Sequence, residues 1–408
     1  MHASPRARLP FEVWALVAGG FTVALGYGVV APAIPQFALE FGVSTFAASA
    51  IVSAFAFMRL VSAPLAGWLV GKFGERRSYT AGILIVAGST GAAALAMNYG
   101  QFVVLRGLGG IGSTMFTVAS TALLIKVSPP TARGRVASLN AAGFLLGGLL
   151  GPVFGGLVAG FGLRAPFVFY FLTLIAAAIV VTIALRRSQA AGSPDPEAHG
   201  VPAMTLREAI GIGQYRTLLL SVFAFGWTSF GVRVSVIPIF IAVAFHGDAA
   251  TAAWILAAYA AGNAILIFPS GRWNDTLGRK PMLIVGMLTL AATYAAFPAS
   301  PTLWVAAALM FVAGAGSALV NPGQQAVLAD MLAQRRGGNV VAAYSMTSDL
   351  GGVLGPLIAG AIVDWAGFGW AFGVTALLVA VAGVAWTLVP DSRTLGGAPD
   401  LGDAGPSR

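Results

Sequence analysis

The chain alternates between long apolar segments and short polar connections. Twelve apolar segments are each long enough to cross the roughly 30 Å hydrocarbon core of a bilayer as a helix. They cover residues 11–34, 45–70, 79–97, 101–125, 136–160, 166–185, 218–243, 251–270, 281–298, 302–328, 339–363 and 369–389. We expect the first to be retained, because it is too long for a signal-peptide core and no small-residue cleavage site follows it. The pattern predicts an all-α integral membrane protein.

The composition supports lipid as the solvent of this chain. Of the 408 residues, 58% are hydrophobic and 9% are charged, whereas a soluble domain has about 25% charged residues. The chain has no cysteine, which excludes disulfides, thiolate metal sites and cysteine nucleophiles.

The basic residues indicate an orientation. With both termini inside, nineteen of the 23 Lys and Arg residues fall in cytoplasmic segments, and only Arg164 falls in an outer loop. The positive-inside rule therefore predicts a multi-pass plasma (inner) membrane protein with cytoplasmic termini. The same rule explains the pI of about 10.3 without nucleic acid as a partner.

The two halves of the sequence repeat at a constant offset of 204 residues. Gly67 aligns with Gly271, Gly110 with Gly314, and Pro152 with Pro356. One offset across four helices predicts two six-helix pseudo-repeats in the same orientation. We expect an N-terminal half (1–187), a cytoplasmic linker (188–217), a C-terminal half (218–390) and a cytoplasmic tail (391–408). The end of the linker, "TLREAIGIGQYR", is a candidate short surface helix.

Two loops carry the same motif. The sequence "GRWNDTLGRK" contains Gly271, Asp275, Gly278 and Arg279, and "GWLVGKFGERR" contains Gly67 and Gly74. Both are similar to the loop motif of the major facilitator superfamily, Gly-x-x-x-Asp-x-x-Gly-Arg-Arg/Lys. The first copy departs from it, with Gly71 in the place of the Asp and Glu75 in the place of the first basic residue. In this family the Asp helps to latch one conformation near the cytoplasmic face, so the resemblance leaves that role to Asp275.

Two further motifs extend the resemblance over nearly the whole chain. "LRGLGGIGS", which begins at Leu105, looks like the family's Arg-x-x-x-Gly-x-Gly motif. Gly-x-x-x-Gly-Pro-x-x-Gly-Gly is typical of the twelve-helix drug:proton antiporter branch. It is formed by Gly147, Gly151, Pro152, Gly155 and Gly156. The resemblance implies a secondary transporter that works by alternating access.

The glycines at every fourth position lie on one helix face, where small residues permit close backbone approach in lipid. Pro152 removes a backbone hydrogen bond and permits a bend. Gly355 and Pro356 repeat the device in the eleventh segment. We expect this face to let the two halves pack tightly and slide; static packing is the alternative.

Ionisable residues inside the apolar segments are candidates for function. They are Arg59, Arg106, Arg233 and Asp349. Asp349 is the only carboxylate deep in a segment, and the resemblance makes its segment a neighbour of the one that holds Arg59. We therefore expect Asp349 to carry a coupling proton with Arg59 as its partner in one conformation. A permanent structural pair is the rival interpretation.

The family's central cavity is lined by the first, fourth, seventh and tenth segments. The resemblance makes these side chains candidate lining residues: Tyr27, Arg106, Trp227, Arg233, Asn321, Gln324 and Gln325. Three Arg against one Asp favour an anionic or zwitterionic substrate.

We interpret the chain as a proton-coupled exporter of small amphipathic molecules or drugs, monomeric, with no cofactor, no metal and no enzymatic constellation. A sugar or metabolite exporter, an uncoupled facilitator and a non-transporting sensor or scaffold remain as alternatives.

Overall fold

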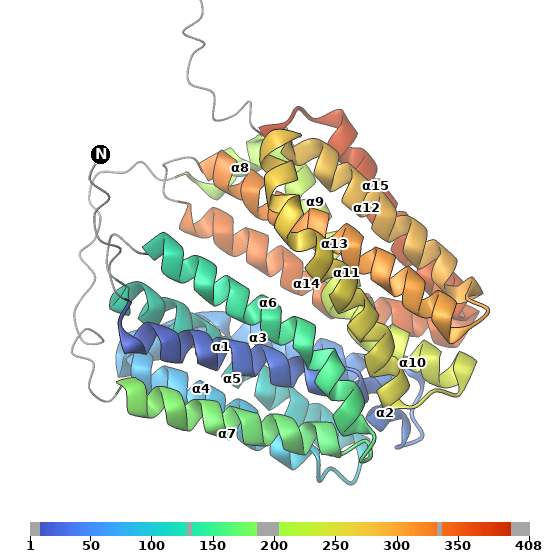
Figure 1. Cartoon of the computed structure of the whole chain (residues 1–408), viewed down its shortest axis with the longest axis horizontal. Coiled ribbons are helices and arrows are strands. Elements are labelled where there is room, and N and C mark those ends of the chain that lie inside the picture. The colour runs from blue at the N-terminus through green and yellow to red at the C-terminus, as the bar shows by residue number, and fades with distance from the viewer. Residues whose placement is uncertain (1–8, 129–132, 186–203, 333–336, 393–408) are drawn as a thin grey trace, which may run out of the picture.

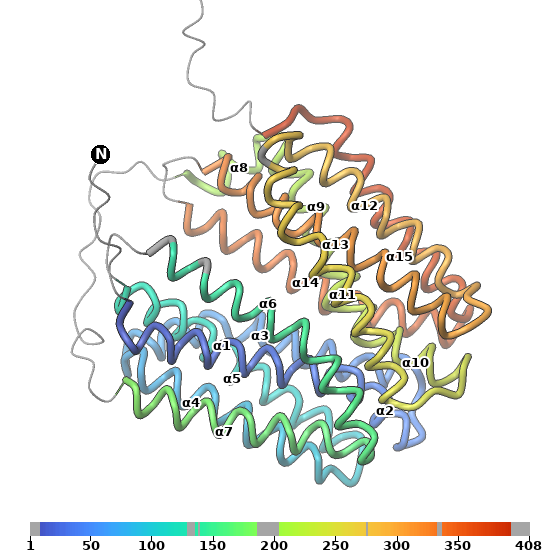
Figure 2. The backbone as a smooth tube through the Cα atoms, in the orientation of Figure 1, coloured from blue at the N-terminus to red at the C-terminus, as the bar shows by residue number. Residues whose placement is uncertain are grey.

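The protein consists of two helical bundles that lie side by side (Figure 1). The computed structural model describes residues 9–128, 133–185, 204–332 and 337–392, and these residues include no strand. The fold is therefore all-α, as the apolar pattern predicts. Figure 2 shows that each half of the chain forms one of the two bundles.

Seven helices form the N-terminal half. They are α1 (Phe11–Val30), α2 (Ala33–Leu39), α3 (Thr45–Phe73), α4 (Glu75–Ala93), α5 (Tyr99–Val127), α6 (Arg133–Ala159) and α7 (Ala165–Leu185). The C-terminal half contains α8 (Leu206–Gly211), α9 (Gly213–Gly226), the π-helical turn η3 (Trp227–Val232), α10 (Arg233–Phe245), α11 (Ala249–Thr276), α12 (Arg279–Ala296), η4 (Phe297–Ala299), α13 (Leu303–Leu332), α14 (Gly338–Ala366), α15 (Phe368–Ala385) and η5 (Trp386–Leu388).

Eleven helical segments of the described residues are long and apolar enough to cross a membrane. The remaining predicted segment, the third in the chain, corresponds to α4, which is 19 residues long and begins with Glu75, Arg76 and Arg77. These charges lower its mean hydropathy, but α4 packs between α5 and α7 within the bundle. The predicted segment, 79–97, starts four residues late because the charged first turn does not look apolar.

Two predicted segments are interrupted. The first breaks at residues 31–32, so that α2 follows α1 as a separate short helix. The seventh starts at Gly213, earlier than predicted, and runs through α9, η3 and α10.

The domain boundaries remain a prediction, because residues 186–203 and 393–408 lie outside the described part of the chain.

Local chemistry fixes the helix ends. The side chains of Ser44, Asn98 and Asp248 cap α3, α5 and α11 by accepting a hydrogen bond from a first-turn N–H. The hydrogen bonds from Thr251 hold the pKa of Asp248 below its usual value. Gly74 and Gly278, at equivalent motif positions, have φ values of 82° and 111° at the α3–α4 and α11–α12 turns. A side chain would strain these turns, which explains the motif glycine.

The glycine face of α6 packs within its own half. A Cβ atom on Gly151 would lie 2.6 Å from the Cα atom of Gly28 in α1, and one on Gly155 would lie 3.0 Å from the carbonyl oxygen of Val29. Gly147 faces the backbone of Phe21 in the same helix. The prediction that this face lies between the halves is therefore wrong for Gly147, Gly151 and Gly155. Four-residue spacing defines a face, but not the helix that covers it.

The C-terminal half repeats this packing with α14 against η3. A Cβ atom on Gly355 would lie 2.8 Å from the carbonyl oxygen of Trp227, and one on Gly231 would lie 3.0 Å from Cδ of Pro356. Gly28 and Gly231 therefore occupy equivalent places. The carbonyl oxygen of Leu25 faces Gly151 in the same way that the carbonyl oxygen of Trp227 faces Gly355. Gly28 follows Leu25 by three residues, whereas Gly231 follows Trp227 by four. The π-helical turn accommodates the extra residue.

The halves meet at one end of the molecule. We call the end where α1 begins the proximal end, and the end that holds α2 and α10 the distal end. Among the described residues, hydrogen bonds join the halves at three places: Gln36 Nε2 donates to Pro238 O (3.1 Å), Ser53 Oγ donates to Val353 O (2.7 Å), and Asp364 accepts from the N–H groups of Thr45 and Phe46 (2.9 and 2.8 Å).

Two motif glycines do lie between the halves. A Cβ atom on Gly156 of α6 would lie 2.8 Å from the ring of Trp254 in α11, and one on Gly360 of α14 would lie 3.0 Å from Ser49 in α3. Both contacts are nearer the distal end. Small residues therefore permit close approach between the halves where α6 meets α11 and where α14 meets α3.

Candidate functional site

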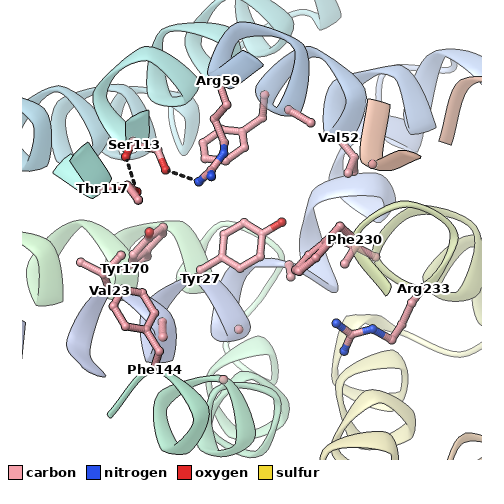
Figure 3. Close-up of a pocket in the computed structure, with 18 of the residues that line it drawn as sticks. Val23, Tyr27, Val52, Arg59, Ser113, Thr117, Phe144, Tyr170, Phe230 and Arg233 are labelled. Atoms are coloured by element: carbon pink, nitrogen blue, oxygen red, sulfur yellow. Dashed lines mark hydrogen bonds between the residues drawn. The ribbon is translucent and has the colours of Figure 1, made fainter. Parts of the chain in front are cut away.

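A cavity of about 370 Å³ lies between the two halves (Figure 3). Its volume falls within the range of small-molecule sites. Most of its lining is apolar, and six aromatic side chains contribute to it: Tyr27, Phe55, Phe116, Phe144, Tyr170 and Phe230. Its charged lining residues are Arg59, Arg233 and Asp349. The cavity therefore offers a large apolar contact area and three ionisable side chains.

Arg59 and Asp349 belong to different halves and line the same cavity. Arg59 lies on α3 and Asp349 on α14, and these helices pack against each other. The guanidinium of Arg59 donates from Nη1 to Ser113 Oγ at 2.9 Å (Figure 3). Among the described residues no ion pair joins Arg59 to Asp349, although both side chains line this cavity from adjacent helices. The two groups are near each other but unpaired in this conformation.

Arg233 enters the cavity from the C-terminal half, across from Tyr27 in Figure 3. Its Nε and Nη2 atoms donate to the carbonyl oxygen of Ser229, at 3.0 and 2.8 Å. The guanidinium carbon lies 4.3 Å from the ring centroid of Tyr259. The ring and the carbonyl together fix the orientation of the guanidinium.

Arg106 does not line the cavity. It is buried in the N-terminal half, and its guanidinium carbon lies 4.7 Å from the ring centroid of Phe55. Its Nε atom has no hydrogen-bond partner among the described residues. Phe55 lines the cavity and lies between it and Arg106.

Tyr27 and Arg233 line the cavity as predicted, but four other predicted lining residues lie elsewhere. Trp227 donates from Nε1 to Thr375 Oγ1 at 3.1 Å and faces α15 of its own half. Gln324 donates to Ser221 Oγ of α9, and Gln325 donates to Asn321 on the same helix. None of these four side chains lines the cavity. Trp227 lies on a segment that does line the cavity, so only its rotation about the helix axis was mispredicted. The other three lie on α13, which contributes no lining residue, so the prediction that the tenth segment lines the cavity is wrong.

Sequence reasoning missed several lining residues. Ser113 stands next to a motif glycine, and its equivalent in the second half is Ser317, so the repeat contained a signal for it. Tyr170 and Phe144 lie among apolar residues, and nothing in their sequence context distinguishes a cavity wall from a lipid-facing surface. Phe230 lies three residues before Arg233, so that ionisable residue was a signal for it.

The loop motifs lie at the proximal end. A Cβ atom on Gly67 or Gly271 would have no neighbour within 4 Å. Arg279 donates from Nε to Asp330 at 3.3 Å and from Nη1 to Asn274 O at 2.6 Å. Asp275 belongs to α11, and its side chain lies outside the described part of the chain. The latch role expected of Asp275 remains a prediction.

No group of three or more His, Asp or Glu side chains that could hold a metal ion occurs in residues 9–128, 133–185, 204–332 and 337–392. The arrangement is instead that of a polytopic membrane protein with a binding cavity between two pseudo-symmetric halves. Such an arrangement defines the class of secondary transporters.

Comparison with known proteins gives the family. The model of the Major Facilitator Superfamily matches residues 16–234 and again residues 218–406. The chain belongs to this superfamily and is a transporter rather than an enzyme.

Individual relatives fit this assignment. The chain is 26% identical over 361 residues to "Multidrug resistance protein 2" of Bacillus subtilis, covering 86% of this chain and 88% of the relative. It is 26% identical over 382 residues to "Multidrug resistance protein MdtG" of Citrobacter koseri, covering 88% and 90%. A bacterial homologue of the human lysosomal transporter Spinster, solved in an inward-facing and unoccupied conformation, has the same fold. It gives a TM-score of 0.76 at 17% identity and covers 95% of this chain and 98% of that one.

Proposed function

We propose that the protein exports small amphipathic molecules in exchange for protons, by alternating access to the cavity between its halves. One observation carries the proposal: Asp349 and Arg59 line one cavity from opposite halves without forming an ion pair. Two relatives are multidrug resistance proteins, which supports amphipathic substrates.

The proposal includes an orientation. Basic residues concentrate at the proximal end, among them Lys72, Arg76, Arg77 and Lys126, so we place this end and both termini in the cytoplasm. The halves join at the distal end through Asp364 and Ser53. The structure is then an inward-facing conformation of a plasma (inner) membrane protein. We expect a monomer without a nucleic-acid partner.

The coupling step uses the charge of Asp349. Ionised Asp349 is stabilised when Arg59 is close, and it takes up a proton when the halves move apart and leave it in an apolar wall. In this conformation Arg59 is held by Ser113, so an alternative partner for the guanidinium already exists. A side chain with two alternative partners is what a switch requires, and a permanent structural pair would not provide it.

Asp349→Asn tests this proposal. Purified protein in proteoliposomes should take up fluorescent amphipathic dyes against their gradient when a pH gradient is imposed. Asp349→Asn should keep downhill exchange of the dyes and lose pH-driven accumulation, because an amide does not carry the proton. Glu40→Gln, which removes an exposed carboxylate at the end of α2, is the matched control and should accumulate the dyes normally.

The alternatives give other results. Normal pH-driven accumulation by Asp349→Asn excludes Asp349 as the carrier, and loss of folded Asp349→Asn protein favours a structural pair. Downhill flux without pH-driven accumulation in the unmodified protein indicates a facilitator. A sensor or scaffold gives no flux of any dye, and transport of sugars alone indicates a sugar or metabolite exporter.

A further inference from the structure

The cavity holds one positive charge without a carboxylate partner. Arg59 lies on α3, which packs against α14, the helix of Asp349, whereas no carboxylate of the described residues lies within ion-pair distance of Arg233. The titratable groups that line the cavity are Tyr27, Arg59, Tyr170, Arg233 and Asp349. Ionised Asp349 therefore leaves a net charge of +1 on the cavity wall. A half-buried guanidinium without a counter-charge is costly, and an anionic group of a ligand would remove that cost.

The geometry leaves one edge of Arg233 available. A guanidinium has five N–H donors, and Nε and Nη2 each donate one to Ser229 O. In the π-helical turn the backbone N–H of Arg233 donates to Thr228 O instead of Ser229 O. The carbonyl oxygen of Ser229 is therefore available to the side chain of Arg233. Nη1 donates to no described residue. The edge formed by Nη1 and Nη2 can bind a carboxylate through two parallel hydrogen bonds.

The rest of the cavity suits an aromatic or aliphatic body. Tyr27 and Phe230 lie between Arg59 and Arg233 in Figure 3. A ligand whose anionic end reaches Arg233 therefore covers apolar rings before it reaches the Asp349 side of the cavity. Flat aromatic groups gain most from such a wall.

The exchange of substrate for protons adds a constraint. A purely anionic ligand would bind better when Asp349 is protonated, since the cavity is then more positive. Positive coupling of this kind moves the ligand and the proton in the same direction. Exchange requires that the ligand and the proton compete, and a cationic group beside Asp349 competes with its proton.

We propose that the substrates are amphipathic zwitterions, with a carboxylate or similar anion bound by Arg233 and an ammonium group at Asp349. This inference rests on the proposed proton exchange. It assigns Arg233 as the residue that selects for the anionic group, and Asp349 as the site shared by the ammonium group and the proton.

A matched set of probes tests the proposal. An (aminomethyl)naphthoic acid with its two groups at opposite ends of the flat ring system is a fluorescent zwitterion, its methyl ester is a cation and its N-acetyl derivative is an anion. The unmodified protein in detergent should bind the zwitterion about tenfold or more tightly than either derivative, since each derivative loses one charged hydrogen-bonding group. Arg233→Gln should weaken binding of the zwitterion and the anion by about tenfold and leave the cation unchanged. Arg233→Lys should keep part of the preference, because it keeps the charge but not the two-pronged edge.

Arg272→Gln is the matched control, because Arg272 is exposed on α11 and does not line the cavity. It should bind all three probes as the unmodified protein does. Equal binding of the three probes by the unmodified protein, or binding of none of them, overturns the proposal even if Arg233→Gln does not fold. Unchanged binding by folded Arg233→Gln overturns it as well.

The two experiments distinguish a failure of the proposed proton exchange from a failure of the role proposed for Arg233. If the probes rank as expected but no substrate shows pH-driven transport, proton exchange is wrong and the role of Arg233 stands. If pH-driven dye transport is present and the zwitterion is not preferred, the inference about Arg233 is wrong and the exchange stands.

Discussion

Glu75 and Lys126 form an ion pair at the proximal end of the N-terminal half. Their equivalents at the offset of 204 residues are Arg279 and Asp330, which form the same pair with the charges exchanged. The pair joins the start of one helix to the end of another in both halves. Glu75, which departs from the family motif in the first loop, therefore belongs to an ion pair with the charges exchanged. The contact between the two helices is preserved although the residue types differ from the motif.

Reversing the charge of one residue of this pair should destabilise the protein, and reversing the other residue as well should restore its stability. Glu75→Arg places two cations together in a partly buried site and should lower the free energy of unfolding by about 2 kcal/mol. Adding Lys126→Asp recreates the order found at Arg279 and Asp330 and should restore most of the loss. Thermal unfolding in detergent of both single variants and the double variant measures the coupling. Additive losses would show that the pair contributes nothing.

Neighbouring glycines of one motif should respond differently. Gly151→Ala places a methyl group against the backbone of Gly28 and should cost about 1–3 kcal/mol. Gly148→Ala meets no atom within 4 Å and should leave stability unchanged. The unfolding midpoints of the two variants, with Gly88→Ala as a control outside the motif, test this difference. Equal midpoints for Gly151→Ala and Gly148→Ala would contradict the packing of α6 on α1.

A disulfide across the distal contact should stop transport. The Cβ position at Gly360 lies 3.0 Å from that of Ser49, slightly less than the roughly 3.5–4.5 Å of a relaxed disulfide. Ser49→Cys combined with Gly360→Cys should cross-link the halves, block flux, and recover on reduction. Because the chain has no cysteine, the reaction has no background. Gly67→Cys with Gly338→Cys, nearer the proximal end of the same two helices, is the control and should not cross-link. Full flux in the cross-linked protein would exclude opening at this contact.

Single cysteines should report the orientation. Gly211→Cys, at the end of α8, should react with a membrane-impermeant thiol reagent only from the cytoplasmic side. Gly100→Cys, at the start of α5, should react only from outside. Both positions are exposed and free of close contacts. Labelling of Gly211→Cys in intact cells would reverse the proposed orientation.

The sequence predicts the helices and the repeat well, because both depend on patterns along the chain. It does not predict which way a helix faces when all of its faces are apolar. Trp227 illustrates this limit, since its segment lines the cavity but its side chain hydrogen-bonds to Thr375 within the C-terminal half. Arg233 and Tyr27 do line the cavity. Likewise, the sequence does not predict which helix packs against the glycine face of α6, because helix packing in lipid depends on three-dimensional fit rather than on polarity.

The extra residue in η3 sets the symmetry of the cavity. Since Gly28 and Gly231 are equivalent, the preceding residues Tyr27 and Phe230 are equivalent too, and both rings face the cavity. A local twofold axis thus relates two aromatic rings, one from each half. The charges do not obey this axis, because Asn263 and Leu145 stand at the equivalents of Arg59 and Asp349. A flat ligand therefore meets similar rings in either of two orientations related by the axis. Only the charged side chains favour one of these orientations over the other.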